Sequence, residues 1–162
     1  MNPINFIEFD PSLAIHFKEL NVQWLKQYFY VEPIDEEMLS NPQAFFIDKG
    51  GFIFFAAIGE EIAGTFALLK VTDAVYELSK MAVYEKFRGM KIGNQLLDFC
   101  LRKARTLGAR KLVLYSSTRL ENAIHLYRKY GFKEIPVGNT EYKRSDIKME
   151  LDLDVQPVPP KI

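Results

Sequence analysis

The 162-residue chain has few of the residues on which disulfide-bonded and metal-binding domains depend. It contains one cysteine, Cys100, and two histidines, so neither an intramolecular disulfide nor a zinc site with the usual ligand spacing is expected. No apolar run approaches the roughly 20 residues of a membrane span. Residues 1–10 lack the basic segment followed by an apolar stretch that marks a signal peptide. These absences predict a cytoplasmic protein without a metal and without a membrane partner.

The sequence also lacks an excess of charge of either sign. Lys and Arg together number 21, as do Asp and Glu, whereas a dedicated nucleic-acid-binding protein usually has a strongly basic balance. The charges are nevertheless unevenly distributed: residues 1–60 carry nine acids and three bases, and residues 85–133 carry twelve bases and three acids. The basic stretch fits either an anion-binding surface or two solvated helices. We expect no nucleic-acid partner.

Apolar side chains are abundant, at 48% of the residues, which is enough to bury the core of one domain. Their periodicity and the turn residues predict an α/β domain over residues 1–154, in the order β-α-α-β-β-β-α-β-α-β-β, and a proline-rich tail at 155–162. The predicted helices cover 12–28, 35–39, 92–107 and 121–130. The predicted strands cover 4–9, 52–58, 62–71, 75–83, 111–115, 132–135 and 142–153.

The most informative segment, residues 77–97, is predicted to form a strand, a glycine-containing turn and the first turn of a helix. Backbone N–H groups at a helix N-terminus lack internal acceptors and attract anions. Gly89 and Gly93 allow a ligand to approach the backbone closely, and Arg88 and Lys91 add positive charge. The segment therefore fits a pyrophosphate, although the same spacing also occurs in ordinary tight turns.

Two motifs in this half of the chain resemble signatures of the GCN5-related N-acetyltransferase (GNAT) family. Residues 88–93, Arg-Gly-Met-Lys-Ile-Gly, are similar to the family's acyl-CoA-binding pattern, Gln/Arg-x-x-Gly-x-Gly/Ala. Residues 122–132, Asn-Ala-Ile-His-Leu-Tyr-Arg-Lys-Tyr-Gly-Phe, are similar to its second signature. Lys91 stands where the first pattern has a glycine. Its N–H can still donate to a phosphate, and the sequence leaves open whether the altered turn weakens cofactor binding.

The resemblance covers about residues 4–153 and implies a strongly twisted mixed sheet, mostly antiparallel and flanked by helices. In the family this sheet splays between its fourth and fifth strands, here 75–83 and 111–115. Acetyl-CoA, the implied acyl donor, would lie in the split, with its pantetheine arm paired to the fourth strand as an added strand would be. The implied cofactor-binding residues are Met81, Ala82, Val83, Arg88, Gly89, Met90, Lys91, Ile92, Gly93, Asn94 and Asn122. For Asn122 the alternative is an ordinary position at a helix N-terminus.

The same resemblance gives catalytic roles to two side chains. Glu77 is the candidate general base that takes the proton of the substrate ammonium; the alternative is a strand-edge carboxylate paired with Lys80. Tyr127 is the candidate general acid for the departing thiolate; the alternative is a helix tyrosine whose ring packs in the core. Alternation along the strand predicts that Glu77 and Met81 share one face and that Lys80 lies on the other.

The predicted function is therefore direct transfer of the acetyl group of acetyl-CoA to an amine in a ternary complex, since no Cys or Ser lies in a recognisable nucleophile–base motif. The acceptor stays open between a small-molecule amine and a peptide or protein amine. Aromatic residues 24–30 and acidic residues 32–37 would form a mouth for a small cation, or else a core-facing helix and an exposed acidic one. The alternative function is a non-catalytic acyl-CoA sensor or assembly module. Members of the family are often dimers, so a homodimer agrees with the resemblance.

Overall fold

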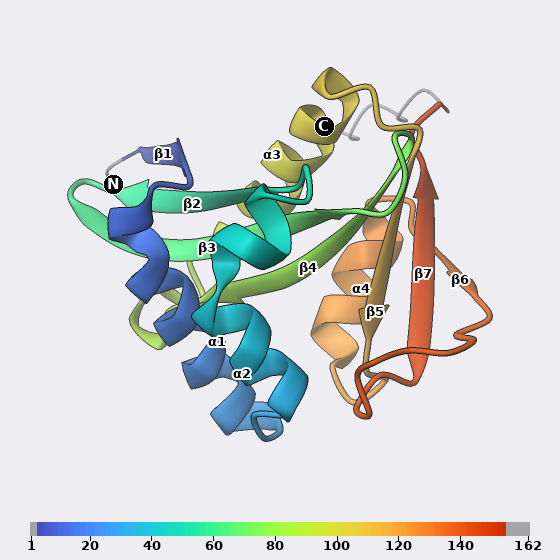
Figure 1. Cartoon of the computed structure of the whole chain (residues 1–162), viewed down its shortest axis with the longest axis horizontal. Coiled ribbons are helices and arrows are strands. Elements are labelled where there is room, and N and C mark those ends of the chain that lie inside the picture. Colours follow the sequence, from blue (N-terminus) through green and yellow to red (C-terminus); the bar gives the residue numbers. More distant parts are fainter. Residues whose placement is uncertain (1–2, 155–162) are drawn as a thin grey trace.

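Residues 3–154 are described by the computed structural model, and they form a seven-stranded sheet with helices on both faces (Figure 1). The proline-rich tail predicted at 155–162 lies outside the described residues. The strands are β1 (Ile4–Glu8), β2 (Phe52–Ile58), β3 (Glu61–Lys70), β4 (Val75–Val83), β5 (Lys111–Ser116), β6 (Lys133–Ile135) and β7 (Ile147–Asp152). The helices are α1 (Ala14–Tyr28), α2 (Pro33–Ser40), α3 (Ile92–Thr106) and α4 (Glu121–Lys129), with short helical turns at Pro11–Leu13, Gln43–Ile47 and Glu85–Phe87.

The strands lie in the order β1-β2-β3-β4-β5-β7-β6. Each neighbouring pair is antiparallel except β4 and β5, which are parallel and are joined by a crossover through α3. This topology confirms the predicted mixed, mostly antiparallel sheet. The order of the strands and of the four long helices is also the predicted one.

The last strand is shorter than the prediction of 142–153. Residues 136–146 form an irregular connection instead, and two of their backbone N–H groups bind side chains rather than a neighbouring strand. The N–H of Lys143 donates to Oε1 of Glu32 at 3.0 Å, and the N–H of Tyr142 donates to Oγ1 of Thr140 at 3.2 Å. The connection therefore reaches across to the N-terminus of α2.

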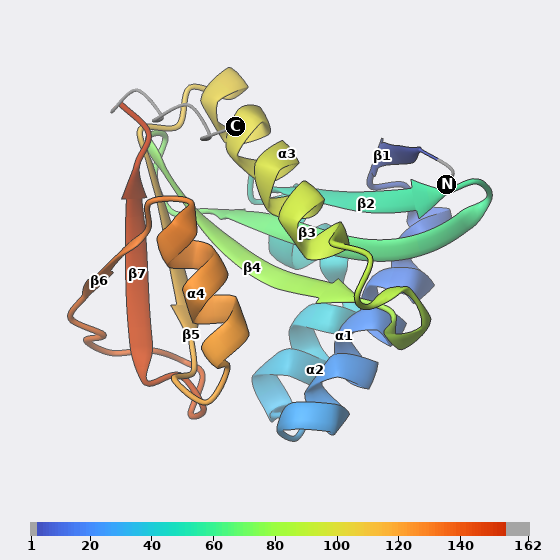
Figure 2. The ribbon, with the colours of Figure 1, turned by 180° about the vertical axis from the view of Figure 1, so that it is seen from behind.

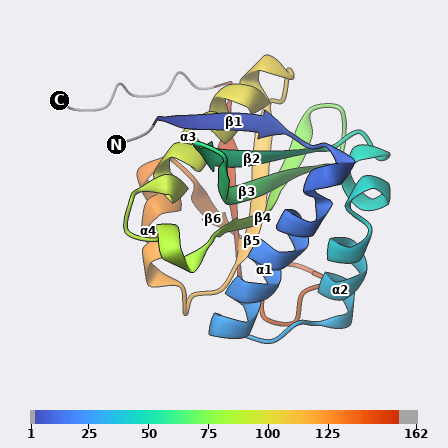
Figure 3. The ribbon, with the colours of Figure 1, turned by 90° about the vertical axis from the view of Figure 1, so that its left-hand side faces the viewer.

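The two faces of the sheet are covered by different helices. Helices α1 and α2 lie on one face, and α3 and α4 lie on the other (Figures 2 and 3). Phe54 and Phe55 are neighbours on β2, are 4% and 0% exposed, and belong to the two separate cores. Apolar runs in the central strands thus reflect burial on both faces, as the sequence predicts.

The sheet opens between β4 and β5. These strands pair only from Val75 to Glu77 on β4 and from Lys111 to Val113 on β5. Beyond Glu77, β4 continues beside β3 while β5 continues beside β7, and the two diverge (Figure 1). The backbone of residues 78–83 therefore has a β-strand neighbour on one side only, which is the predicted splay.

Strand β4 contains a bulge that the sequence did not predict. Its register against β3 shifts at Phe66, and Lys80 there has a φ of 56°, a left-handed conformation. The bulge reverses the alternation of the following side chains. Lys80 points toward α2, on the same face as Glu77, whereas Met81 packs against the core under α3. The predicted placement of Glu77 with Met81, opposite Lys80, is wrong for this reason.

Candidate active site

A cleft of about 390 Å³ continues from the opening between β4 and β5. It is lined by the C-terminal half of α1, by β4 and β5, by the start of α3, by α4 and by the connection 136–146. The predicted site residues that line it are Glu77, Met81, Ala82, Val83, Arg88, Gly93, Asn122 and Tyr127. The other predicted residues, Gly89, Met90, Lys91, Ile92 and Asn94, lie outside the lining, and the side chain of Ile92 is buried in the core. For Ile92 only the backbone is therefore a candidate contact.

The turn before α3 keeps a tight backbone despite the lysine in it. Lys91 has φ 59° and ψ 27°, the left-handed conformation that a glycine adopts without strain. Gly89 has a φ of 84°, and a Cβ added at Gly89 or Gly93 would meet no atom within 4 Å. The replacement at Lys91 therefore leaves the turn intact, and Gly93 faces open space at the cleft.

Several N–H groups at this turn are free to bind an anion. No atom of residues 3–154 accepts a hydrogen bond from the backbone N–H groups of residues 89–94. Beside them, Arg88 donates from Nε to the carbonyl of Val83 at 3.2 Å, and its Nη2 is buried without a partner among the same described residues. Unpaired donors at a helix N-terminus, together with a guanidinium, suit phosphate groups. The residues present fit the phosphate end of a nucleotide cofactor such as CoA.

Glu77 is a buried carboxylic acid on the wall of the cleft, with 9% of its surface exposed. Its pKa is raised to about 7, mainly by burial; the charge of Lys80 lowers the pKa, that of Glu141 raises it and that of Lys148 lowers it. In the described part of the chain no cation lies within ion-pair distance of Glu77, and Lys80 pairs with Asp35 instead. In the structure Glu77 therefore forms no ion pair with Lys80. A carboxyl group that titrates near neutrality can accept a proton at physiological pH.

Tyr127 has features of both a catalytic tyrosine and a tyrosine that packs in the core. Its ring packs edge-on against Phe132 at a centroid distance of 5.8 Å, yet the residue also lines the cleft. Burial raises the pKa of the phenol to about 12, with a smaller contribution from Cys100. The phenol is thus protonated throughout the physiological range. Its hydroxyl group donates to no atom of residues 3–154, so its proton is available to a ligand.

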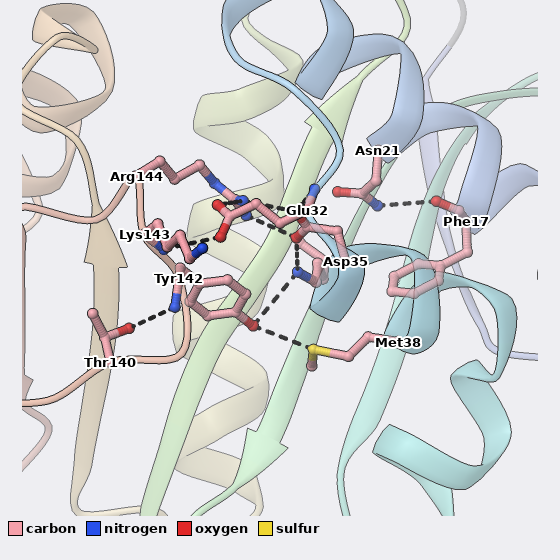
Figure 4. A network of polar contacts seen from close by, with 10 residues as sticks. Phe17, Asn21, Glu32, Asp35, Met38, Thr140, Tyr142, Lys143 and Arg144 are labelled. Atoms are coloured by element: carbon pink, nitrogen blue, oxygen red, sulfur yellow. Dashed lines mark hydrogen bonds and ion pairs between the residues drawn. The ribbon is translucent and has the colours of Figure 1, made fainter.

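A buried network of ion pairs lies beside Glu77, and the sequence did not predict it (Figure 4). Asp35, which is fully buried, accepts from Nη1 and Nη2 of Arg144 at 2.7 and 2.9 Å and from Nζ of Lys80 at 3.1 Å. Glu32 accepts from Nη1 of Arg144 at 2.7 Å. The hydroxyl of Tyr142 lies 3.5 Å from Nζ of Lys80. Lys80, Tyr142 and Arg144 line the cleft, whereas Glu32 and Asp35 do not.

The acidic segment 32–37 therefore does not form an acidic mouth. Glu32 and Asp35 are neutralised inside the protein, and Glu36 pairs with Lys18 on the outer surface at 2.9 Å. The aromatic half of the expected mouth is present, because Trp24, Tyr28 and Phe29 line the cleft. The acceptor end is thus aromatic and close to neutral rather than strongly negative.

The mixed sheet that opens between β4 and β5, the cleft at this opening and the free N–H groups at the turn before α3 together form an arrangement expected of an acyltransferase. Residues 18–132 match the Acetyltransferase (GNAT) family, and the chain belongs to that family. An uncharacterized N-acetyltransferase of Bacillus subtilis, YvbK, is 29% identical over 121 residues, or 70% of this chain and 78% of that protein. The mycothiol acetyltransferase of Corynebacterium efficiens is 27% identical over 121 residues, and the matched region spans only 41% of its length.

Solved structures share the whole architecture. An acetyltransferase of the GNAT family from Staphylococcus aureus Mu50 superposes with a TM-score of 0.83 at 23% identity, over 93% of this chain and 99% of that one. YncA from Salmonella typhimurium, solved with its cofactor acetyl-CoA, gives 0.72 at 19% identity over 99% of each chain. A spermidine N-acetyltransferase from Vibrio cholerae, solved with CoA and spermine, gives 0.72 at 18% identity over 93% of this chain and 96% of that one. At these identities the likeness establishes the fold.

No helix between residues 3 and 154 is long and apolar enough to cross a bilayer. The same residues contain no group of three or more His, Cys, Asp or Glu side chains that could hold a metal ion.

Proposed function

We propose that the protein transfers the acetyl group of acetyl-CoA directly to the amine of an acceptor held in the same cleft. The observation that carries this proposal is the set of free N–H groups at residues 89–94 beside the unpartnered Nη2 of Arg88. They would bind the phosphates of CoA. The single-sided backbone of residues 78–83 would pair with the pantetheine arm, and the thioester would then lie near Met81, Ala82 and Val83. Asn122, on the opposite wall, would contact the same arm.

Glu77 would act as the general base. The acceptor amine is a cation at neutral pH, and only its free form has the lone pair that attacks the thioester carbonyl carbon. A buried carboxylate whose pKa is about 7 can take that proton, directly or through a water molecule. Backbone N–H groups near the β4 bulge would stabilise the negative charge that develops on the carbonyl oxygen.

Tyr127 would stabilise the leaving thiolate. When the C–S bond breaks, the sulfur carries the electron pair and needs a proton or a hydrogen-bond donor. The pKa of Tyr127, about 12, is higher than that of a thiol, which is about 8.5. Full transfer of its proton is therefore uphill, and the phenol would act mainly as a hydrogen-bond donor to the thiolate, which would leave as such or take a proton from water.

The replacement of a motif glycine by Lys91 is the feature that favours the alternative, a non-catalytic acyl-CoA sensor. The left-handed backbone of Lys91 supports CoA binding, which both functions require, because the turn before α3 keeps its shape. One experiment separates the two functions. CoA binding is measured by calorimetry, and release of the CoA thiol from acetyl-CoA is followed at pH 8 with a panel of amines. Binding with turnover supports the transferase, binding without turnover on any amine supports the sensor, and no binding contradicts both.

A further inference from the structure

The charged side chains that line the cleft are one acid and three bases: Glu77, Lys80, Arg88 and Arg144. Arg88 lies at the phosphate-binding end, next to the turn before α3. The acceptor end therefore presents a single carboxyl group and two cationic side chains. A site that receives a cationic amine is expected to have more acids than bases. The excess of bases among the described residues at this end therefore bears on the chemistry of the rest of the acceptor.

Lys80 and Arg144 retain hydrogen-bonding capacity beyond the network that holds them. Arg144 uses three contacts to bind Glu32 and Asp35, and a guanidinium has five N–H donors, so two remain. Lys80 binds Asp35 and contacts Tyr142, and an ammonium has three donors, so one remains. Their partner carboxylates lie behind them, outside the lining of the cleft. Lys80 and Arg144 can therefore offer N–H donors to a ligand in the cleft, where Glu77 is the one carboxyl group among the described lining residues.

The aromatic wall of the cleft consists of Trp24, Tyr28 and Phe29. It is less suited to a cationic ligand than three aromatic side chains would imply. The ring of Tyr28 faces the guanidinium of Arg88 at 5.9 Å, and the ring of Phe29 faces that of Arg119 at 5.0 Å. Trp24 packs against both rings, at 5.4 and 5.8 Å. Protein cations thus already lie over the rings of Tyr28 and Phe29, two of the three aromatic residues that α1 and its C-terminus contribute to this wall. What remains is an apolar wall for an uncharged part of the acceptor.

We propose, on the basis of the transferase function above, that the acceptor is a small monoamine with a carboxylate and an apolar body, as in an apolar amino acid. Glu77 faces its amine, and Lys80 and Arg144 bind its carboxylate. A polyamine would have to place its further cations against Lys80 and Arg144. Among the described residues no second carboxylate lines the cleft, and Glu141, whose charge acts on Glu77, is exposed and lies outside the lining.

Matched acceptors test this substrate class. Release of the CoA thiol is measured at pH 8 with leucine and phenylalanine, with their amides, with their decarboxylated amines and with spermidine, and kcat/KM is expressed per free amine. We expect the amino acids to exceed their amides and amines by about 10-fold or more, because two charge-assisted hydrogen bonds are lost without the carboxylate. Equal or better use of spermidine or of the decarboxylated amines overturns the acceptor class and leaves the transferase intact. No release with any amine overturns both.

A variant of Arg144 separates substrate binding from stability. Arg144→Lys keeps a cation for Glu32 and Asp35 but removes the fork of donors. The expected result is a KM for the amino acid raised about 10-fold, with a smaller loss of kcat/KM for the decarboxylated amine, which has no carboxylate to bind. Lys18→Met is the matched control, because it breaks the outer ion pair of α2 with Glu36 and should change neither value. Equal losses for both kinds of acceptor would make Arg144 a structural residue only and contradict the proposal.

Discussion

Lys80 and Asp35 form an ion pair inside the protein, with Nζ 3.1 Å from Oδ1 and with side chains that are 5% and 0% exposed. The pair forms because the bulge in β4 turns Lys80 toward α2. Asp35 is also bound by the guanidinium of Arg144, so one carboxylate joins α2, β4 and the connection 136–146. The acceptor end of the cleft is assembled by this carboxylate, although the carboxylate does not line it.

The first prediction concerns this pair. Lys80→Met should lower the free energy of unfolding by about 2 kcal/mol, because Asp35 loses one of its two cations while it stays buried. The measurement is urea unfolding at pH 7, with Lys18→Met as the control on the outer side of the same helix. The control should leave the transition nearly unchanged, since its ion pair is exposed. A Lys80→Met protein as stable as the wild type would show that the pair contributes nothing to folding.

The order of the helices and strands could be predicted from the sequence, because local patterns of apolar and turn residues mark each element. The apolar runs of β2 and β3, and glycines such as Gly89 and Gly108 near helix ends, marked the elements and their order. The bulge was not predictable in the same way. Lysine does not favour a left-handed backbone. The conformation of Lys80 is imposed by the pairing of β4 with β3. Strict alternation does not allow for the extra residue of the bulge, so it assigns the β4 side chains after Ser79 to the wrong faces of the sheet.

The buried ion-pair network was missed for a related reason. Arg144 lies 109 residues from Asp35 in the chain, and nothing near either residue predicts the other. Asp35 and Glu32 have the spacing of a helix capping box, and they do form one. That local role gave no sign that both carboxylates are buried and neutralised. The candidate residues on β4 and α4 were predictable only because they resemble a family motif.

A second prediction concerns the lysine in the phosphate-binding turn. Lys91→Gly should stabilise the fold by up to about 1 kcal/mol, because glycine adopts the left-handed conformation without strain. CoA binding should weaken about 3- to 10-fold and depend less on salt, because one cation near the phosphates is lost. Calorimetric titration at two salt concentrations measures both effects. Lys91→Asn is the matched control, since asparagine tolerates this backbone and also lacks the charge. Unchanged affinity in both variants would place the Lys91 ammonium away from the phosphates.

A third prediction concerns Tyr127. Tyr127→Phe keeps the ring against Phe132 and removes the hydroxyl group. Turnover with acetyl-CoA and an active amine should fall by about 10²-fold, within the range for loss of a proton donor. The melting temperature should stay the same or rise, because the hydroxyl donates to no atom of residues 3–154. A rate equal to that of the wild type would restrict Tyr127 to packing.

A fourth prediction follows from the raised pKa of Glu77, about 7 in the folded protein against about 4.5 in the unfolded chain. The unfolded chain releases this proton first as the pH rises, so Glu77 lowers stability progressively between pH 4.5 and 7 and by a constant amount above pH 7. Glu77→Gln removes this cost and should be about 2 kcal/mol more stable than the wild type at pH 8, and equally stable at pH 4. Urea unfolding at the two pH values gives the comparison. Equal stability at both would mean that the carboxylate is not desolvated.

The last prediction concerns the same side chain in catalysis. If Glu77 is the base, kcat/KM should rise with pH through an apparent pKa near 7 and level off above it. Glu77→Gln should lose about 10²-fold or more near neutral pH and recover part of the loss at high pH, where more of the acceptor amine is already deprotonated. The same variant should keep its affinity for CoA, because the phosphate-binding turn lies at the other end of β4.

The two predictions for Glu77 have opposite signs, and this distinguishes a catalytic carboxylate from a structural one. Glu77→Gln is expected to be more stable and less active at pH 8, a combination that arises when burial of an ionised group serves the reaction and not the fold. An equal loss of rate at every pH, together with a lower stability, would indicate a defect in folding or binding. A variant that keeps full activity would assign proton removal to solvent water, with Glu77 as a buried carboxyl group beside the acceptor.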